Sequence, residues 1–392
     1  MSNPLKEYVS AVISGRFRQF GCDPGDGPGL KNINKPELIE FIIAEGLAPV
    51  IYDLCGHGDP LSLFGKCLHQ AYLQTAMRNT LLFSEFAKIA EQAKFPVMPL
   101  KGAFLTMKVY GNPNLRPMQD IDVLVKKQDV TAMETLLRER GYGRLEACVQ
   151  DEKCKMKNEE RTRFPGIGLI NEQTRSPAYS INSIYLRKYI DGNKYLFSDV
   201  HVHWHWINAS YYLNFEKIDI DEIWKTAREI EWQNGTKAYA VPDELLLLHL
   251  AEHNLKHNFR KMVKLLDVAM VLKKCSMDWD RVERYARQFN LIKPLLYTLI
   301  FTEDAFPGAV PAGIIRRFDC GPRTHLELRF ERMIKSGVRK TGMNWLVYQS
   351  MCGGGYGRLK TAVRLAASLF CRKGGLGRLA GAVDIFPMRV LS

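Results

Sequence analysis

The sequence predicts an α+β protein in which an α/β core is flanked by helical regions at both ends. A short apolar strand, a turn, a helix and a second strand follow one another between residues 95 and 126. Apolar and polar residues then alternate strictly from residue 196 to residue 206, which is typical of a strand with one buried face. We therefore predict an N-terminal helical region of residues 1–94, an α/β core of residues 95–241, a helical region of residues 242–305 packed on the core, and a basic helical C-terminal region of residues 306–392.

Length and composition limit the class of protein. The chain has 392 residues, of which 46% are hydrophobic, and this is enough for two or three packed units. No apolar stretch reaches the length of a membrane-spanning helix. The nine cysteines include no Cys-x-x-Cys pair and no secretory signal is visible, so we expect reduced thiols and a cytoplasmic location.

The predicted elements follow in order along the chain. Residues 145–174 are polar and charged, and they form either a mobile substrate loop or a hairpin of modest stability. From Pro242 onward helices dominate, with boundaries near Ser276, Leu291 and His325. The earlier predicted helices cover residues 35–54, 61–94, 103–109 and 128–140, and the predicted strands cover residues 96–100, 119–126 and 196–206.

Two carboxylates lie two residues apart on the second predicted strand. Because side chains alternate across a strand, Asp120 and Asp122 share one face while Ile121 and Val123 face the apolar packing. Paired carboxylates suit Mg²⁺ or Mn²⁺, and Mg²⁺ commonly binds substrate phosphates at the same time. Such ions activate an attacking oxygen and neutralise the departing one. The pair predicts phosphoryl or nucleotidyl transfer, although a bare Asp-x-Asp also occurs in solvated loops.

A lysine and a glycine stand where the first strand turns into a helix. Gly102 lets the backbone approach a phosphate, the helix N-terminus offers unpaired N–H groups, and Lys101 adds a positive charge. Arg116, four residues before Asp120, either reaches the same phosphates or pairs with Asp120 or Asp129. A phosphate role and plain structural pairing both stay open for Lys101 and Arg116.

The alternating strand places four polar side chains on one face: Asp199, His201, His203 and His205. Imidazole groups suit Zn²⁺ and related ions. Three successive same-face residues of one strand span two pleats, however, and rarely converge on a single ion. A dedicated zinc site is therefore the minor alternative.

Three more histidines follow on the helix that begins near Pro242. His249, His253 and His257 recur every four residues, but they lack the His-Glu-x-x-His order of zinc proteases. We interpret His249 and His253 as polar groups of a domain interface or a substrate pocket. Asp267 lies in an apolar helical run, where a carboxylate needs a partner. We expect a structural partner, for example a histidine of the preceding helix, and contact with the base or ribose of a nucleotide is the alternative.

Residues 100–125 resemble the nucleotidyltransferase superfamily with the DNA polymerase β palm fold, and within it the branch described as uncharacterised nucleotidyltransferases. The resemblance extends through the helical lead-in and the His/Trp strand, and it fades after about residue 305. It implies a polymerase β-like core and transfer of NMP from an NTP to a hydroxyl acceptor, with release of pyrophosphate. The matching residues are Leu100, Lys101, Gly102, Tyr110, Arg116, Asp120, Asp122, Leu124 and Val125.

The resemblance also implies roles for the matching residues. Asp120 and Asp122 would bind Mg²⁺ or Mn²⁺. The triphosphate, with ATP as the favoured donor, would be held by Lys101, Gly102 and Arg116. The superfamily carries a serine where this chain has Ala103, and Lys101 would compensate for the absent hydroxyl.

The superfamily takes a third carboxylate from a neighbouring strand, which here is residues 196–206. Aligning the family's His-Trp pair with His203 and Trp204 puts His201 at the carboxylate position, whereas aligning on Asp199 keeps the acid. We favour Asp199, which would orient or deprotonate the acceptor. With His201 in that position, metal binding or turnover would weaken.

Two other functions are compatible with these residues. The same metal geometry supports kinase-like transfer of a γ-phosphoryl group, and the product mass separates this reaction from NMP transfer. A non-catalytic binding or regulatory protein would keep the fold and use its basic C-terminal region for recognition. The acceptor of the enzyme would be a peptide, a protein or a small molecule, as in natural-product pathways.

Positive charge is concentrated at the C-terminal end of the chain. Residues 308–392 hold eleven Arg and four Lys against four acidic residues, a net charge of +11 out of +13 for the whole chain. Residues 356–370 fit an amphipathic helix, either docked on the core or lying on a membrane surface. This asymmetry predicts an anionic partner. We rank an acidic or phosphorylated acceptor first, an anionic membrane second and nucleic acid last.

Overall fold

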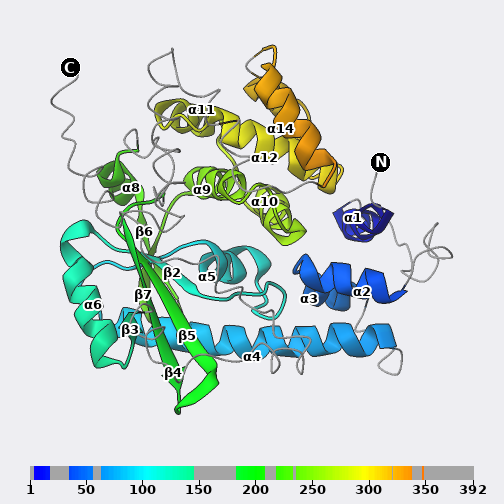
Figure 1. The fold of residues 1–392 in the computed structure, drawn as a ribbon. Helices are drawn as coiled ribbons and strands as arrows, with labels where there is room; N and C mark the ends of the chain where they lie inside the picture. The colour runs from blue at the N-terminus through cyan, green and yellow to red at the C-terminus, as the bar shows by residue number, and fades with distance from the viewer. Residues whose placement is uncertain are drawn as a thin grey trace, which may run out of the picture.

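The computed structural model describes residues 4–17, 35–55, 63–144, 182–207, 218–232, 235–319, 321–337 and 347. Within these ranges the predicted α+β class is confirmed, because helices surround one mixed sheet (Figure 1). None of the helices in these ranges is long and apolar enough to cross a membrane. The polar segment 145–174 and the amphipathic helix predicted over 356–370 lie outside the described residues.

The central sheet has five strands in the order β1-β2-β5-β4-β3. The neighbours β2 and β5 run parallel, whereas the other three pairs are antiparallel. The strands β6 and β7 form a separate antiparallel pair. The bounds are β1 (Met98–Pro99), β2 (Ile121–Leu124), β3 (Gly143–Arg144), β4 (Ser183–Ile190), β5 (Asn193–His203), β6 (Arg228–Glu231) and β7 (Lys237–Ala240).

Two strand predictions need correction. The strand predicted over residues 196–206 begins at Asn193 and ends at His203, so His205 lies beyond it. The sequence analysis also missed β4, which pairs with β5 along most of its length. Buried and half-buried residues do not alternate regularly along β4, so the period of two that marks a strand is weak there.

The N-terminal helices are α1 (Pro4–Phe17), α2 (Lys35–Ala44), α3 (Ala48–Leu54) and the long α4 (Leu63–Gln92). The single helix predicted over residues 35–54 is therefore wrong. The chain breaks at Gly46, whose φ of 74° lies in the left-handed region that glycine adopts readily. A Cβ at this position would also lie 3.0 Å from Val263, so the turn packs closely on a later helix.

Most of the remaining helices lie on the side of the sheet that carries α5, whereas α6 packs with α4 on the other face. In Figure 1, α9 and α10 lie above α5, with α11 and α12 above them and α4 along the bottom. They are α5 (Lys101–Leu105), the π-helix η2 (Thr106–Tyr110), the short η3 (Lys127–Asp129), α6 (Val130–Glu139), α8 (Ile220–Thr226), α9 (Asp243–Lys256), α10 (Met262–Lys274), α11 (Trp279–Gln288), α12 (Ile292–Ala305), α13 (Ile314–Phe318) and α14 (His325–Lys335).

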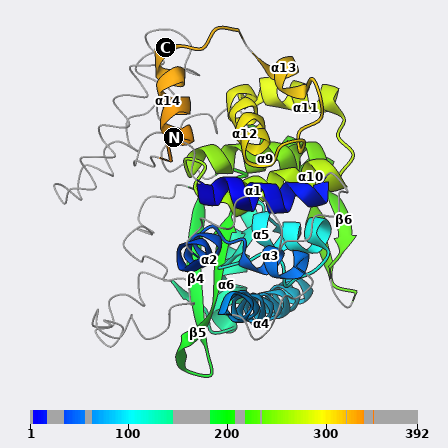
Figure 2. The same cartoon turned by 90° about the vertical axis from the view of Figure 1, so that its right-hand side faces the viewer.

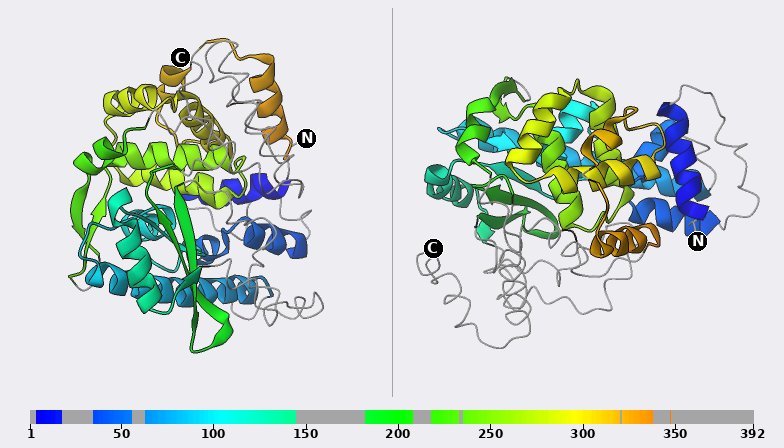
Figure 3. Two further views of the ribbon diagram at one scale, coloured as in Figure 1. Left: turned by 60° about the vertical axis from the view of Figure 1, so that its left-hand side comes forward. Right: turned by 90° about the horizontal axis from the view of Figure 1, so that it is seen from above.

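Two hydrophobic clusters hold these layers together. One cluster joins the strand residues Val123 and Val200 to Phe86 of α4 and Met133 of α6. The other joins the helices from α1 to α14 and draws residues from all four of the predicted regions. Figure 2 shows α9 and α10 between α12 above and α5 below, and α1 packs against α2, α3 and α12. Figure 3 shows α1, α2 and α3 at the opposite side of the molecule from α6. The sheet is thus covered on both faces, and polar side chains between the strands and α10 are enclosed.

Candidate active site on the polar face of the sheet

Strands β2 and β5 position the predicted carboxylates and histidines. Their parallel register sets Asp122 opposite His201 and Leu124 opposite His203. Val123 and Val202 belong to the hydrophobic cluster that joins the sheet to α4 and α6. Because side chains alternate, Asp122 and both histidines face the other way, toward α5 and the helices above it.

Asp122 is the centre of a compact polar cluster. Its Oδ1 atom lies 3.0 Å from Lys101 Nζ, 2.8 Å from His203 Nε2 and 3.2 Å from His201 Nδ1. Burial alone would raise the pKa of Asp122, but Lys101 and the hydrogen bonds from the two histidines hold it well below its ordinary value. The carboxylate of Asp122 is therefore ionised, and it is contacted by the ammonium group of Lys101 and by the rings of His201 and His203.

Lys101 reaches Asp122 because of an unusual backbone turn. Its φ is 45°, in the left-handed region that non-glycine residues seldom adopt. The preceding residue, Leu100, donates its backbone N–H to the carbonyl of Asp122 over 2.8 Å, which fixes the turn against β2. The prediction that the first strand turns into a helix at Lys101 and Gly102 is confirmed. Such strained backbone is often found at functional sites.

The two histidine rings have different second partners. His201 Nε2 lies 2.8 Å from the hydroxyl of Ser183 on β4. His203 is 2% exposed, and its Nδ1 has no hydrogen-bond partner in the described part of the chain. Burial and the neighbouring His201 lower the pKa of His203 well below its ordinary value, so its ring is neutral. The two rings lie 3.9 Å apart between centroids.

Asp199 lies in a different environment at the other end of this face. It is fully buried and accepts two hydrogen bonds from Arg187, over 2.7 Å and 3.0 Å. The hydroxyl of Tyr185 lies 2.9 Å from Asp199 and 3.4 Å from Asp120, and so links the two carboxylates. The residue opposite Asp122 is His201, while Asp199 is paired with arginine. A catalytic role for Asp199 stays a prediction.

Arg116 and Asp267 form a buried pair. The guanidinium donates from Nε and Nη2 to the two carboxylate oxygens, each over 2.8 Å. Tyr110, at the end of the π-helix η2, donates its hydroxyl to the same carboxylate over 2.9 Å. The predicted structural partner of Asp267 is therefore present, but it is Arg116 and not a histidine. Burial lowers the pKa of Arg116, but Asp267 outweighs this effect and raises it.

Gly102 is explained by the position of Arg116. A Cβ on Gly102 would lie 2.8 Å from Arg116 Nη1 and 3.3 Å from Met118 Cγ. Because Asp267 fixes the guanidinium, it cannot easily give way. The glycine thus lets the first turn of α5 lie directly against a charged side chain.

Arg78 and Asn79 on α4 are positioning residues that were not predicted from the sequence. Arg78 donates to the carbonyls of Phe197 on β5 and Gln119 just before β2. Asn79 is fully buried and donates to the carbonyl of Arg116 over 2.8 Å. Together they hold the loop that carries Arg116 and the strand that follows it. A polar pair inside an amphipathic helix was the only signal available.

The helices α9 and α10 bring further basic groups close to this cluster. His249 is 3% exposed, and burial and Lys101 lower its pKa to about 3. Burial and Lys264 lower the pKa of His253 well below its ordinary value. Burial, followed by Lys101 and Arg116, lowers the pKa of Lys264 itself to about 7. The sequence analysis did not single out Lys264, because only the packing of α10 places it near other cations.

Three of these side chains could hold a metal ion. One ligand atom each from Asp122, His201 and His203 lies within 4.8 Å of the others. The predicted zinc alternative used His205 as a third ligand, but its Nδ1 lies 3.2 Å from the carbonyl of Ile207 instead. Asp120 directly precedes β2 and Asp122 lies within it, and joint binding of a divalent ion by these two carboxylates stays a prediction.

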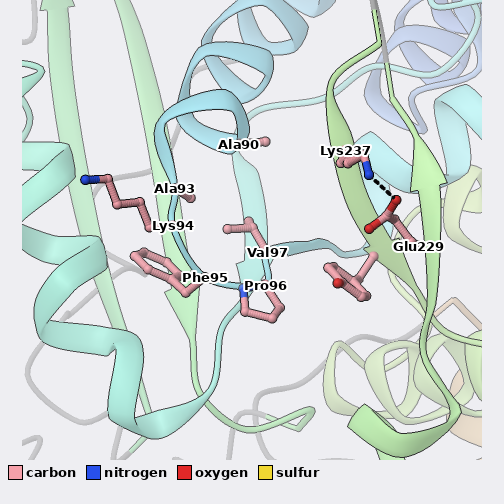
Figure 4. A pocket seen from close by; sticks show the side chains of 9 residues that line it. Ala90, Ala93, Lys94, Phe95, Pro96, Val97, Glu229 and Lys237 are labelled. Atoms are coloured by element: carbon pink, nitrogen blue, oxygen red, sulfur yellow. Dashed lines mark ion pairs between the residues drawn. The ribbon is translucent and has the colours of Figure 1, made fainter.

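A pocket of about 280 Å³ elsewhere on the surface does not include the predicted site residues (Figure 4). It lies between the end of α4 and the β6–β7 pair, and Lys237 and Glu229 form an ion pair at its rim. The polar cluster around Asp122 therefore stays the candidate active site.

Two comparisons with known proteins bear on this site. A family model described as uncharacterised nucleotidyltransferase matches residues 31–307. The matched range contains the sheet, α9, α10 and all the predicted site residues. The comparison with curated proteins returned no match.

Proposed function

The chain belongs to the uncharacterised nucleotidyltransferase family, and we propose that it transfers NMP from an NTP to a hydroxyl acceptor. The reaction would use a divalent metal ion. Family membership supports an NTP-using transferase in general. The finer parts of the proposal concern Mg²⁺ or Mn²⁺ as the ion, ATP as the donor and the class of acceptor. They rest on the residues around Asp122.

The observation that carries the proposal is the convergence of anionic and cationic groups on one face of β2 and β5. Asp120 and Asp122 would hold the ion, which would supply Lewis-acid polarisation of a phosphate when bound. Lys101 and Arg116 lie beside them and would face the triphosphate. Helix α10 adds Lys264, whose pKa is lowered first by burial and then by the nearby Lys101.

Lys101 has a contact that suits exchange. Its Nζ lies 3.0 Å from Asp122, and the lysine is 15% exposed, so it is neither buried nor locked by a bidentate contact. A triphosphate offers it a stronger anion than one carboxylate does. Lys101 would therefore turn from Asp122 to the phosphates when the nucleotide binds.

Asp199 and Tyr185 would act on the acceptor side. Tyr185 contacts both Asp120 and Asp199, so a hydroxyl near Asp120 would meet a hydrogen-bonding partner. Asp199 already receives two hydrogen bonds from Arg187, and this fixed geometry suits a group that orients the acceptor. We therefore assign Asp199 the positioning part of its predicted role.

A non-catalytic binding protein is the second candidate. Two of the buried carboxylates already have cationic partners, Lys101 on Asp122 and Arg187 on Asp199. Under this alternative the site would keep the fold, and the basic residues 358–378, outside the described residues, would bind the partner.

Thermal unfolding with each of the four NTPs, with and without Mg²⁺, tests the proposal. The protein should be stabilised by about 2.7 kcal/mol at a nucleotide concentration of about a hundred times Kd. The double variant Asp120→Asn/Asp122→Asn should lose this shift, whereas the exposed control Asp221→Asn should keep it. The product mass then separates NMP transfer from γ-phosphoryl transfer. Absence of a shift with every NTP would favour the binding protein.

A further inference from the structure

We propose that Asp122, His201 and His203 form a site for one borderline divalent transition ion, of the Zn²⁺ or Co²⁺ class, which this site binds in preference to Mg²⁺. The inference deepens the proposed function, since Asp122 belongs to both. It concerns the ion that the chain selects by itself, before any nucleotide is present.

The geometry of the three side chains is close to that of a bound ion. Zn²⁺ binds imidazole nitrogen and carboxylate oxygen at about 2.0–2.2 Å in a tetrahedral arrangement, which separates neighbouring ligand atoms by about 3.4 Å. His201 Nδ1 and His203 Nε2 lie 3.2 Å and 2.8 Å from Asp122 Oδ1. Small rotations of the side chains would therefore open the space for an ion.

The ligands come from rigid, adjacent elements. Asp122 and His201 face each other in the parallel register of β2 and β5, and His203 follows two residues later on the same face. Asp122 and His203 are buried, and His201 is 20% exposed on its side chain. Because His201 and His203 approach one carboxylate oxygen of another strand, they converge, which two histidines on a strand would not do alone. Because His201 is the part-exposed ligand, a coordination position of the ion on that side would stay open for a substrate.

The donor set decides the class of ion. Mg²⁺ requires oxygen ligands in near-octahedral geometry, whereas imidazole suits Zn²⁺, Co²⁺ and related ions. Two of the three donors here are imidazole nitrogens. The carboxylate on β5, Asp199, is paired with Arg187.

Ser183 makes His201 adaptable. Its hydroxyl lies 2.8 Å from His201 Nε2 and can either donate or accept a hydrogen bond. Without an ion, Nδ1–H donates to Asp122 and the hydroxyl donates to Nε2. With an ion, the proton resides on Nε2 and is accepted by Ser183, which leaves the Nδ1 lone pair for the metal. Such outer partners commonly orient histidine ligands.

Lys101 competes with the ion for Asp122. Its Nζ lies 3.0 Å from the same oxygen that both histidines contact. The ion must therefore displace this ammonium group. Displacement is feasible because the ammonium group makes a single contact in the described structure of this cluster. Replacing Lys101 by methionine should strengthen binding of the ion.

Titration of the full-length, nucleotide-free protein with Co²⁺ tests the inference, because the visible absorption of Co²⁺ reports imidazole coordination. We expect saturation at one Co²⁺ per chain, displacement by Zn²⁺, and no displacement by a large excess of Mg²⁺. His201→Gln and His203→Gln should each weaken binding at least about tenfold, because even the loss of an outer partner weakens metal affinity by that much.

Two further variants serve as controls. His205→Gln, just beyond the end of the same strand, should bind Co²⁺ like the wild type, because its ring contacts Ile207 instead. Lys101→Met should bind Co²⁺ more tightly. Since it removes no buried ligand, this variant keeps the inference testable if His203→Gln fails to fold.

The outcomes separate this inference from the proposed function. Any one of three results would overturn the inference. These are unchanged binding of Co²⁺ in both histidine variants, displacement of Co²⁺ by Mg²⁺ at equal concentration, and weaker binding of Co²⁺ in Lys101→Met. A nucleotide shift with Mg²⁺ in a protein that binds no Co²⁺ would remove the inference and keep the function. A Co²⁺ site without any response to NTPs would do the reverse.

Discussion

The polar face of β2 and β5 carries one carboxylate at each end, and the two carboxylates have different kinds of partners. At one end, Asp199 is fully buried and receives a bidentate contact from Arg187. At the other end, Asp122 receives single contacts from Lys101 and the rings of His201 and His203. Both carboxylates lie on one face of neighbouring strands, so their partners make the difference.

The comparison shows which end is built for exchange. Arginine stays charged and fits a carboxylate with two parallel hydrogen bonds, so the Asp199 end is a fixed structural pair. Lysine and imidazole make single contacts, and imidazole can also bind a metal ion. We therefore expect the Asp122 end to exchange its partners for an ion and a triphosphate, and the Asp199 end to keep its arginine.

The largest effect that would sharpen this comparison is expected at the fixed end. Arg187→Met should lower the free energy of unfolding by about 3–5 kcal/mol, because it leaves Asp199 buried without its partner. Urea denaturation measures this change. The exposed pair of Arg138 and Glu134 provides the control, since Arg138→Met should change stability by less than about 1 kcal/mol. Equal losses in the two variants would contradict the contrast.

The exchangeable end should respond in activity more than in stability. We expect Asp122→Asn to lower kcat/KM for NMP transfer at least about a hundredfold, because it removes a direct ligand to the ion. Its free energy of unfolding should change less than that of Arg187→Met, since Lys101 is part-exposed. Kinetics and urea denaturation on the same samples give both values. If Asp122→Asn destabilised the fold as much as Arg187→Met, the two ends would not differ.

A smaller effect should follow from crowding beside the exchangeable end. Gly102→Ala would place a Cβ 2.8 Å from Arg116 Nη1. Overpacking of this kind destabilises by about 1–3 kcal/mol. It should also weaken the NTP-dependent thermal shift, because Arg116 is displaced. Gly141→Ala, where a Cβ meets nothing within 4 Å but φ is 85°, measures a backbone effect alone and should leave the nucleotide response intact.

The last effect depends on pH and concerns Lys264, whose folded pKa is about 7 against an ordinary value of 10.5. Between these values the unfolded chain binds the proton and the folded chain does not, so this residue makes stability rise with pH from about 7 to 10.5. Below pH 7 both states are protonated and the penalty is constant. Urea denaturation from pH 6 to pH 10 should show a shallower rise in Lys264→Gln than in the wild type. A parallel profile in the two proteins would place the cause elsewhere.

Much of the fold was readable from local patterns. The alternation from Leu196 onward predicted β5, and the apolar stripe of residues 128–140 predicted α6. The turn at Lys101 and Gly102 followed from a strand that ends and a helix that begins. Errors arose where the pattern was weak or the chain bent for tertiary reasons. The helical pattern breaks at Gly46, where the turn packs on Val263. That contact cannot be predicted from the residues near Gly46 in the sequence.

By itself, the sequence determined the class of fold, the family and the central polar residues such as Asp122, His201 and His203, because these depend on periodicity and on local motifs. Only the tertiary structure decided which polar residues meet. The parallel register of β2 and β5 brings Asp122 opposite His201, and β4 supplies Arg187 to Asp199. Partners of a buried charge lie far apart along the chain, so their pairing depends on strand register and helix packing.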